Sequence, residues 1–69
     1  MKKFLVREAI EMLMNRKIED INNIYFEVDG CYFYADEIYF FEGGVKFHNN
    51  GYDEGQTYNF NEYVYIEEK

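Results

Sequence analysis

The sequence predicts an α+β fold, in which an N-terminal amphipathic helix packs on a four- to five-stranded antiparallel sheet. Two patterns lead to this prediction. Residues 3–16 carry apolar side chains at helical spacing, and most of the later chain alternates apolar residues with tyrosines and acids, as strands do. The length and the apolar content of the chain indicate how many domains it can form. The chain has 69 residues, of which 48% are hydrophobic and 22% aromatic, so we treat residues 1–69 as a single domain.

The predicted helix, residues 3–16, has an apolar arc roughly 200° wide on a helical wheel. A helix that contacts one sheet face needs a narrower apolar arc than this, so the width of the arc indicates either burial of the helix under the following chain or a subunit contact. Arg16 and Lys17 suit the dipole at the helix end. Residues 18–23 form the predicted connector to the sheet. The apolar arc consists of Leu5, Val6, Ala9, Ile10, Met12, Leu13 and Met14.

The strongest strand signal is a hairpin centred on Asp29-Gly30, a pair that suits a type I′ turn because both positions need a positive φ. The predicted strands are residues 23–29 and 31–35, with Val28 opposite Cys31. Side chains of a strand alternate between faces. We therefore expect one face to pack against the helix and the other to point outward. The helix-facing set is Ile24, Phe26, Val28, Cys31, Phe33 and Ala35, and the outward set is Tyr25, Glu27, Tyr32 and Tyr34.

The rest of the chain predicts two or three further strands. Asp36-Glu37 forms a turn, residues 38–42 a strand, Gly43-Gly44 a second turn and residues 45–48 another strand. Residues 48–56 read as a polar loop, and residues 57–67 as a last strand with a bulge or break near Asn61-Glu62. The second hairpin places Ile38, Phe40, Val45 and Phe47 on one face, and Tyr39, Phe41, Lys46 and His48 on the other.

Six of the eight tyrosines fall on the outward face, together with carboxylates. Tyrosine has a high strand propensity, so such a face can simply be a solvated surface. Tyrosine is also a favoured interface anchor, because its large ring loses little conformational entropy on binding. We therefore predict a protein-binding face, which could also bind a second copy of the chain. Its predicted residues are Tyr25, Glu27, Tyr32, Tyr34, Asp36, Glu37, Tyr39, Tyr63, Tyr65 and Glu67.

The net charge of −7 is distributed unevenly. Residues 1–17 hold five basic and two acidic side chains, a balance of +3, whereas residues 18–69 hold two basic and twelve acidic ones, a balance of −10. This acidity argues against direct nucleic-acid binding and favours a basic protein partner, including one that itself holds nucleic acid. Solubility and protection of sheet edges would equally explain the acids. No segment is long and apolar enough for a transmembrane helix.

No motif predicts catalysis, a metal or a cofactor, so we expect a protein that is not an enzyme. Cys31 is the single cysteine, which excludes an intramolecular disulfide and suits a reducing compartment such as the cytoplasm. We expect Cys31 to be buried as a small apolar residue and His48 to lie on the surface, on the opposite face from Cys31. Asp53-Glu54 lacks the alternating oxygen ligands of a calcium loop.

The general character of the chain resembles the small acidic inhibitors that phages and mobile elements use against host defence, such as anti-CRISPR and antirestriction proteins. The resemblance is carried by residues 32–37 and 62–68, where tyrosines alternate with apolar residues and acids. Residues with AT-rich codons make up more than half of the chain, which suggests a low-GC bacterium, its phages or its plasmids. The resemblance implies a nucleic-acid-handling host enzyme as target, with blockade of its DNA or RNA site, and the array of carboxylates could act there by imitating phosphates. Two alternatives stay open: a structural or regulatory homo-oligomer, and a small-molecule or metal-binding enzyme.

Overall fold

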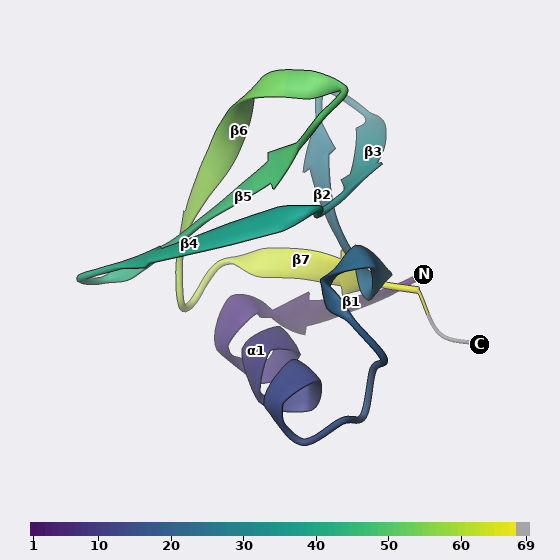
Figure 1. The fold of residues 1–69 in the computed structure, drawn as a ribbon, viewed down its shortest axis with the longest axis vertical. Helices are drawn as coiled ribbons and strands as arrows, with labels where there is room; N and C mark the ends of the chain where they lie inside the picture. Colours follow the sequence, from purple (N-terminus) through teal and green to yellow (C-terminus); the bar gives the residue numbers. More distant parts are fainter. Residues whose placement is uncertain (68–69) are drawn as a thin grey trace.

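The computed structural model describes residues 1–67, and for residues 52–54 it describes the backbone alone. Within these residues, one α-helix, one short 3₁₀ turn and seven strands follow one another. Figure 1 shows their arrangement. In chain order they are β1 (Lys2–Leu5), α1 (Val6–Met14), η1 (Ile21–Asn23), β2 (Ile24–Val28), β3 (Cys31–Tyr34), β4 (Glu37–Phe41), β5 (Gly44–Asn49), β6 (Tyr52–Asn59) and β7 (Tyr63–Ile66).

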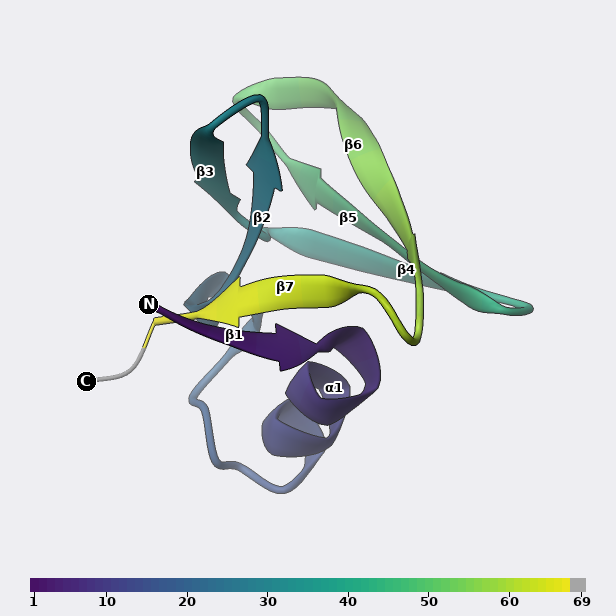
Figure 2. The same ribbon diagram turned by 180° about the vertical axis from the view of Figure 1, so that it is seen from behind.

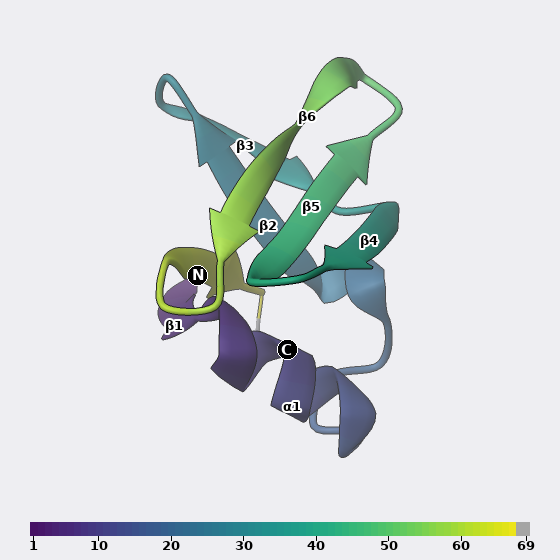
Figure 3. The ribbon, with the colours of Figure 1, turned by 90° about the vertical axis from the view of Figure 1, so that its left-hand side faces the viewer.

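The predicted α+β class is confirmed, but the strands form two antiparallel sheets rather than one. The first, sheet A, has the order β1-β7-β2-β3, and the second, sheet B, has the order β4-β5-β6. Figure 3 shows sheet B on the near side of β2 and β3, with α1 below them. Rings from the two sheets meet in the core, where Phe26 of β2 stacks on Phe47 of β5 with 6.4 Å between centroids. Both side chains are fully buried, so the core lies between the two sheets.

The helix is shorter than residues 3–16, and the prediction was wrong at both ends. Residues 2–5 form β1, which pairs with β7 and lies beside it in Figure 2. At the other end, Arg16 adopts a left-handed φ of 59°, and the amide of Lys17 donates to the carbonyl of Met12 at 2.7 Å. This is the hydrogen bond of a Schellman cap, which ends the helix after Met14. The apolar arc looked wide because it included Leu5, which is in β1, and Met14, which is exposed.

The helix covers sheet A at β1 and β7 instead of the whole hairpin face. Its buried side chains are Val6 and Ala9. The amide of Val6 donates to the carbonyl of Glu62 at 2.8 Å, which ties the first helical turn to the segment before β7. Within residues 1–67, no helix reaches the length and apolar character needed to cross a membrane.

The Asp29-Gly30 hairpin has the predicted register. Both turn residues have a positive φ, 50° and 86°, and Val28 faces Cys31. The buried face is also confirmed for Ile24 and Phe26, which have no exposed surface. Cys31 is an exception: its thiol is exposed, not buried, because the tip of the hairpin extends past the core.

The second hairpin turns one residue earlier than predicted. Its turn is residues 42–43, with Gly43 at φ 93°, and Gly44 is the first residue of β5. A Cβ on Gly44 would collide with the carbonyl oxygen of Tyr58, so this position has no room for a side chain. The predicted faces hold in register, since Ile38 pairs with Phe47, yet Phe40 is 61% exposed on the free edge strand β4.

The predicted loop at residues 48–56 is mostly strand. β5 continues to Asn49 after a bulge, and β6 begins at Tyr52. The predicted last strand, residues 57–67, is two strands. The break near Asn61-Glu62 is confirmed, and it moves the chain from β6 in sheet B to β7 in sheet A.

Candidate protein-binding site

Five tyrosines lie together on the outer side of sheet A. The register aligns Lys3, Tyr65, Tyr25 and Tyr34 in one row that crosses all four strands, because Tyr65 pairs with both Lys3 and Tyr25, and Tyr25 pairs with Tyr34. Glu27 pairs with Tyr32 one step further along the hairpin. We call this surface the tyrosine face. It consists of Lys3, Tyr25, Glu27, Tyr32, Tyr34, Tyr63 and Tyr65.

The rings of the tyrosine face contact one another at their edges. The centroids of Tyr32 and Tyr65 lie 5.1 Å apart at 89°, and those of Tyr25 and Tyr34 lie 6.5 Å apart at 73°. These T-shaped contacts hold the rings in place while leaving them accessible. Tyr32, Tyr34 and Tyr63 are 48%, 46% and 51% exposed. The face is therefore a preordered aromatic surface, which lowers the entropy lost on binding.

Two phenols of the tyrosine face, those of Tyr25 and Tyr32, have a raised pKa. The pKa of Tyr25 is raised above 10, mainly because its hydroxyl donates to the Glu67 carboxylate at 3.0 Å, and a phenolate there would be repelled. The pKa of Tyr32 is also raised, first by its electrostatic interaction with Tyr65. The charged side chains of the face are Glu27 and Lys3, and the ammonium nitrogen of Lys3 lies 4.7 Å from the centre of the Tyr63 ring.

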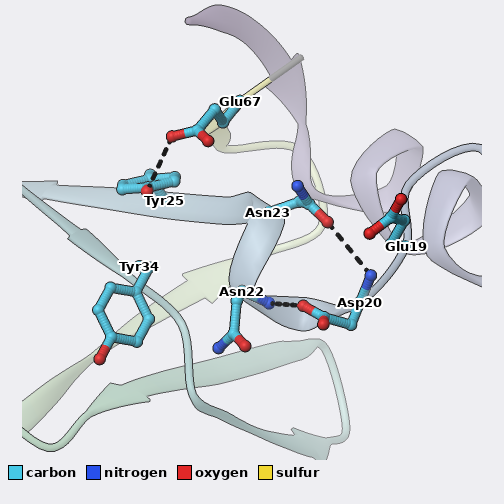
Figure 4. A pocket seen from close by; sticks show the side chains of 7 residues that line it. All are labelled: Glu19, Asp20, Asn22, Asn23, Tyr25, Tyr34 and Glu67. Carbon is cyan, nitrogen blue, oxygen red and sulfur yellow. Dashed lines mark hydrogen bonds between the residues drawn. The ribbon is translucent and has the colours of Figure 1, made fainter. Parts of the chain in front are cut away.

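A shallow pocket of about 390 Å³ opens at one end of the face, between η1 and β2 (Figure 4). Its lining combines three carboxylates, two phenols and two amides, with no basic side chain. Asp20 caps the 3₁₀ turn by accepting from the backbone amide of Asn22 at 2.7 Å, and both residues line the pocket. Such a lining suits a cationic group. The lining residues are Glu19, Asp20, Asn22, Asn23, Tyr25, Tyr34 and Glu67.

The predicted site residues fall into two groups. Tyr25, Glu27, Tyr32, Tyr34, Tyr63 and Tyr65 share the tyrosine face, and Glu67 follows β7 and contacts Tyr25. Asp36, Glu37 and Tyr39 lie elsewhere, at the start of β4 in sheet B, because the chain changes sheets after β3. There the Tyr39 hydroxyl donates to Glu37 at 2.7 Å, and this bond raises the pKa of Tyr39.

Sequence reasoning missed Lys3 and the pocket. Lys3 joins the face only because residues 2–5 form a strand, and Lys-Lys-Phe-Leu shows no alternation that would indicate one. The pocket depends on η1, and Asp20 followed by Asn22-Asn23 was a usable cap signal. Cys31 and His48 lie in different sheets, in β3 and β5. The side chains of Asp53 and Glu54, and all of Glu68, lie outside the described part of the chain.

Comparison with known proteins gives no relative: no family model, no curated protein and no solved structure matches this chain. Function must therefore be argued from the site.

Proposed function

We propose that this chain is a non-enzymatic binding protein that uses the tyrosine face and its adjoining pocket to cover a basic surface of a bacterial nucleic-acid-handling enzyme. The observation that carries the proposal is the tyrosine face itself. It presents preordered, half-exposed rings next to a pocket whose lining holds three carboxylates and no basic side chain. Burial of the hairpin accounts for Ile24 and Phe26, whereas nothing in the core requires rings at Tyr32 and Tyr34.

Charge supports a basic partner. Residues 18–69, which supply most of the face and the pocket, carry a balance of −10. Attraction to a channel of arginines and lysines would bring the chain to the surface that otherwise holds phosphates. The protein would then act by occlusion, in the cytoplasm of a bacterial host, as the phage-encoded inhibitors that it resembles in character do. Its acidic side chains would stand in for nucleic-acid phosphates.

The test begins with capture from a lysate of a low-GC bacterium at about 0.1 M and about 1 M NaCl, between which the screening length falls from about 10 Å to about 3 Å. Two variants serve as baits beside the wild type. Tyr32→Ala/Tyr34→Ala changes the tyrosine face, and Phe40→Ala/Phe41→Ala removes two exposed rings from β4 as a matched control. We expect the wild type and the β4 variant to retain a nucleic-acid-binding protein at low salt only, and the tyrosine variant to lose it.

The captured protein is then purified and bound to labelled DNA or RNA. We expect the chain to displace the nucleic acid at stoichiometric concentration, measured as a fall in fluorescence anisotropy. Capture that is indifferent to salt, or a ternary complex with nucleic acid still bound, would contradict occlusion.

A second candidate is a homo-oligomer, and one observation favours it. β4 is an edge strand of sheet B, and its Tyr39, Phe40 and Phe41 are all about half exposed or more. Exposed apolar edge strands readily pair with another chain. Sedimentation at micromolar concentration discriminates between the two candidates: a dimer that Phe40→Lys dissolves supports the oligomer, and a monomer excludes it.

A further inference from the structure

Three side chains with metal-binding atoms converge where β4 begins and β5 ends. Glu37 and His48 are paired across the two strands, and the amide of Asp36 donates to the carbonyl of His48 at 2.9 Å. The ligand-type atoms of Asp36, Glu37 and His48 all lie within 4.8 Å of one another. We call these three residues the β4–β5 cluster. It is separate from the tyrosine face, because it belongs to sheet B.

The two distances from His48 Nδ1 to the carboxylate oxygens are close to those of tetrahedral coordination. His48 Nδ1 lies 3.2 Å from Asp36 Oδ1 and 3.5 Å from Glu37 Oε1. Zinc binds nitrogen and carboxylate oxygen at about 2.0–2.1 Å, and tetrahedral angles then separate the ligand atoms by about 3.3–3.4 Å. A metal ion could therefore sit among these atoms with small side-chain shifts.

Each carboxylate directs one oxygen to the cluster because its other oxygen is held elsewhere. Asp36 Oδ2 accepts from the amide of Asn50 at 2.6 Å, and Glu37 Oε2 accepts from the Tyr39 hydroxyl at 2.7 Å. Outer hydrogen bonds of this kind orient the ligands of protein metal sites. The side chains of Asp36, His48 and Glu37 are 15%, 24% and 51% exposed, so one side is open for a water ligand.

We propose that the β4–β5 cluster binds a divalent first-row transition ion, best Zn²⁺, through His48 Nδ1 and one oxygen each from Asp36 and Glu37. An imidazole nitrogen beside two carboxylates favours Zn²⁺ over Mg²⁺ and Ca²⁺, which prefer oxygen ligands only. Three protein ligands and an open fourth position correspond to an exchangeable site. The proposal is independent of partner binding at the tyrosine face.

The test follows the imidazole proton signals by NMR, which belong to His48 alone because the chain has one histidine. The protein carries Cys31→Ser, since the exposed Cys31 thiol would itself bind zinc. We expect ZnCl₂ to shift the His48 signals and to saturate at one equivalent, and MgCl₂ to leave them in place.

Three variants separate a built site from general attraction of zinc to an acidic surface. Glu37→Gln removes a ligand and Glu11→Gln, on the exposed side of α1, changes the net charge equally. We expect zinc binding to be at least tenfold weaker for Glu37→Gln and unchanged for Glu11→Gln. Tyr39→Phe removes only the outer hydrogen bond and should weaken binding about tenfold. His48 signals that do not move with zinc, or equal effects of Glu37→Gln and Glu11→Gln, would overturn the proposal.

Discussion

Truncation of Phe26 and of Tyr34 to alanine should have very different effects on stability, although both residues lie in the same hairpin. Phe26 is fully buried and stacks on Phe33 and Phe47, with centroids 5.8 Å and 6.4 Å away. Phe→Ala at such a position typically costs about 3–5 kcal/mol. A chain of this length has a free energy of unfolding of about 3–10 kcal/mol. Phe26→Ala should therefore remove a third or more of the stability.

Tyr34 lies on the other face of the same hairpin and is 46% exposed. Alanine there removes about half of the burial of an aromatic ring and one edge contact with Tyr25, a cost of about 1–2 kcal/mol. At a urea dependence of about 1 kcal/mol per M, the unfolding midpoint should fall by about 1–2 M.

Urea unfolding followed by far-ultraviolet circular dichroism measures both variants on one scale, with the wild type as reference. Tyr34→Ala should retain the native spectrum without urea, whereas the unfolding midpoint of Phe26→Ala should fall by about 3–5 M, further than that of Tyr34→Ala. If Tyr34→Ala proved as destabilising as Phe26→Ala, the assignment of the buried and outward faces would be refuted. The partner-binding test with Tyr34 would then lose its basis.

Three further predictions concern single side chains. Asn49→Ala should lower the free energy of unfolding, measured by thermal or urea unfolding, by about 2–3 kcal/mol. The buried side chain of Asn49 donates a hydrogen bond to the carbonyl of Tyr34 and accepts one from the backbone amide of Gly51, each at 2.6 Å. A loss of less than about 0.5 kcal/mol would contradict this prediction. Burial raises the pKa of Tyr58 to about 12, so ultraviolet titration of the folded protein should show a phenol that ionises near pH 12 and is absent from Tyr58→Phe. In the unfolded chain the pKa of this phenol returns to about 10, so its contribution to the free energy of unfolding is complete below pH 10 and is lost as the pH rises towards 12. A free energy of unfolding that stays constant between pH 10 and 12 would contradict this prediction. The exposed Cys31 thiol should react with a disulfide reagent at one equivalent without denaturant, and reaction only in urea would show that it is buried.

The first hairpin could be predicted because its information is local. A two-residue turn with positive φ at Asp29 and Gly30 fixes the register, and the register fixes which side chains share a face. The outward position of Tyr25, Tyr32 and Tyr34 followed from that register. No comparable local signal marked the exposure of Cys31, which depends on where the core ends.

The division into two sheets could not be predicted, because it depends on contacts between distant segments. β1 is a strand only because β7 pairs with it, and its helix-compatible sequence merges with that of α1. β6 and β7 form one alternating stretch, and the break at residues 60–62 does not reveal which sheet each strand joins. The β4–β5 cluster escaped notice for the same reason, since Asp36 and His48 meet only through strand pairing.

The central place of β7 in sheet A has a consequence for biosynthesis. β7 lies between β1 and β2 in the sheet, although it is synthesised after all the other described strands. Sheet A therefore cannot be completed until β7 has left the ribosome. The first hairpin can form while synthesis continues, but β1 has no neighbour in its sheet until residues 63–66 emerge. Assembly of sheet A therefore depends on the emergence of β7. A nascent chain stalled before Tyr63 would expose the inner faces of β1 and β2, which makes premature termination a hazard for aggregation.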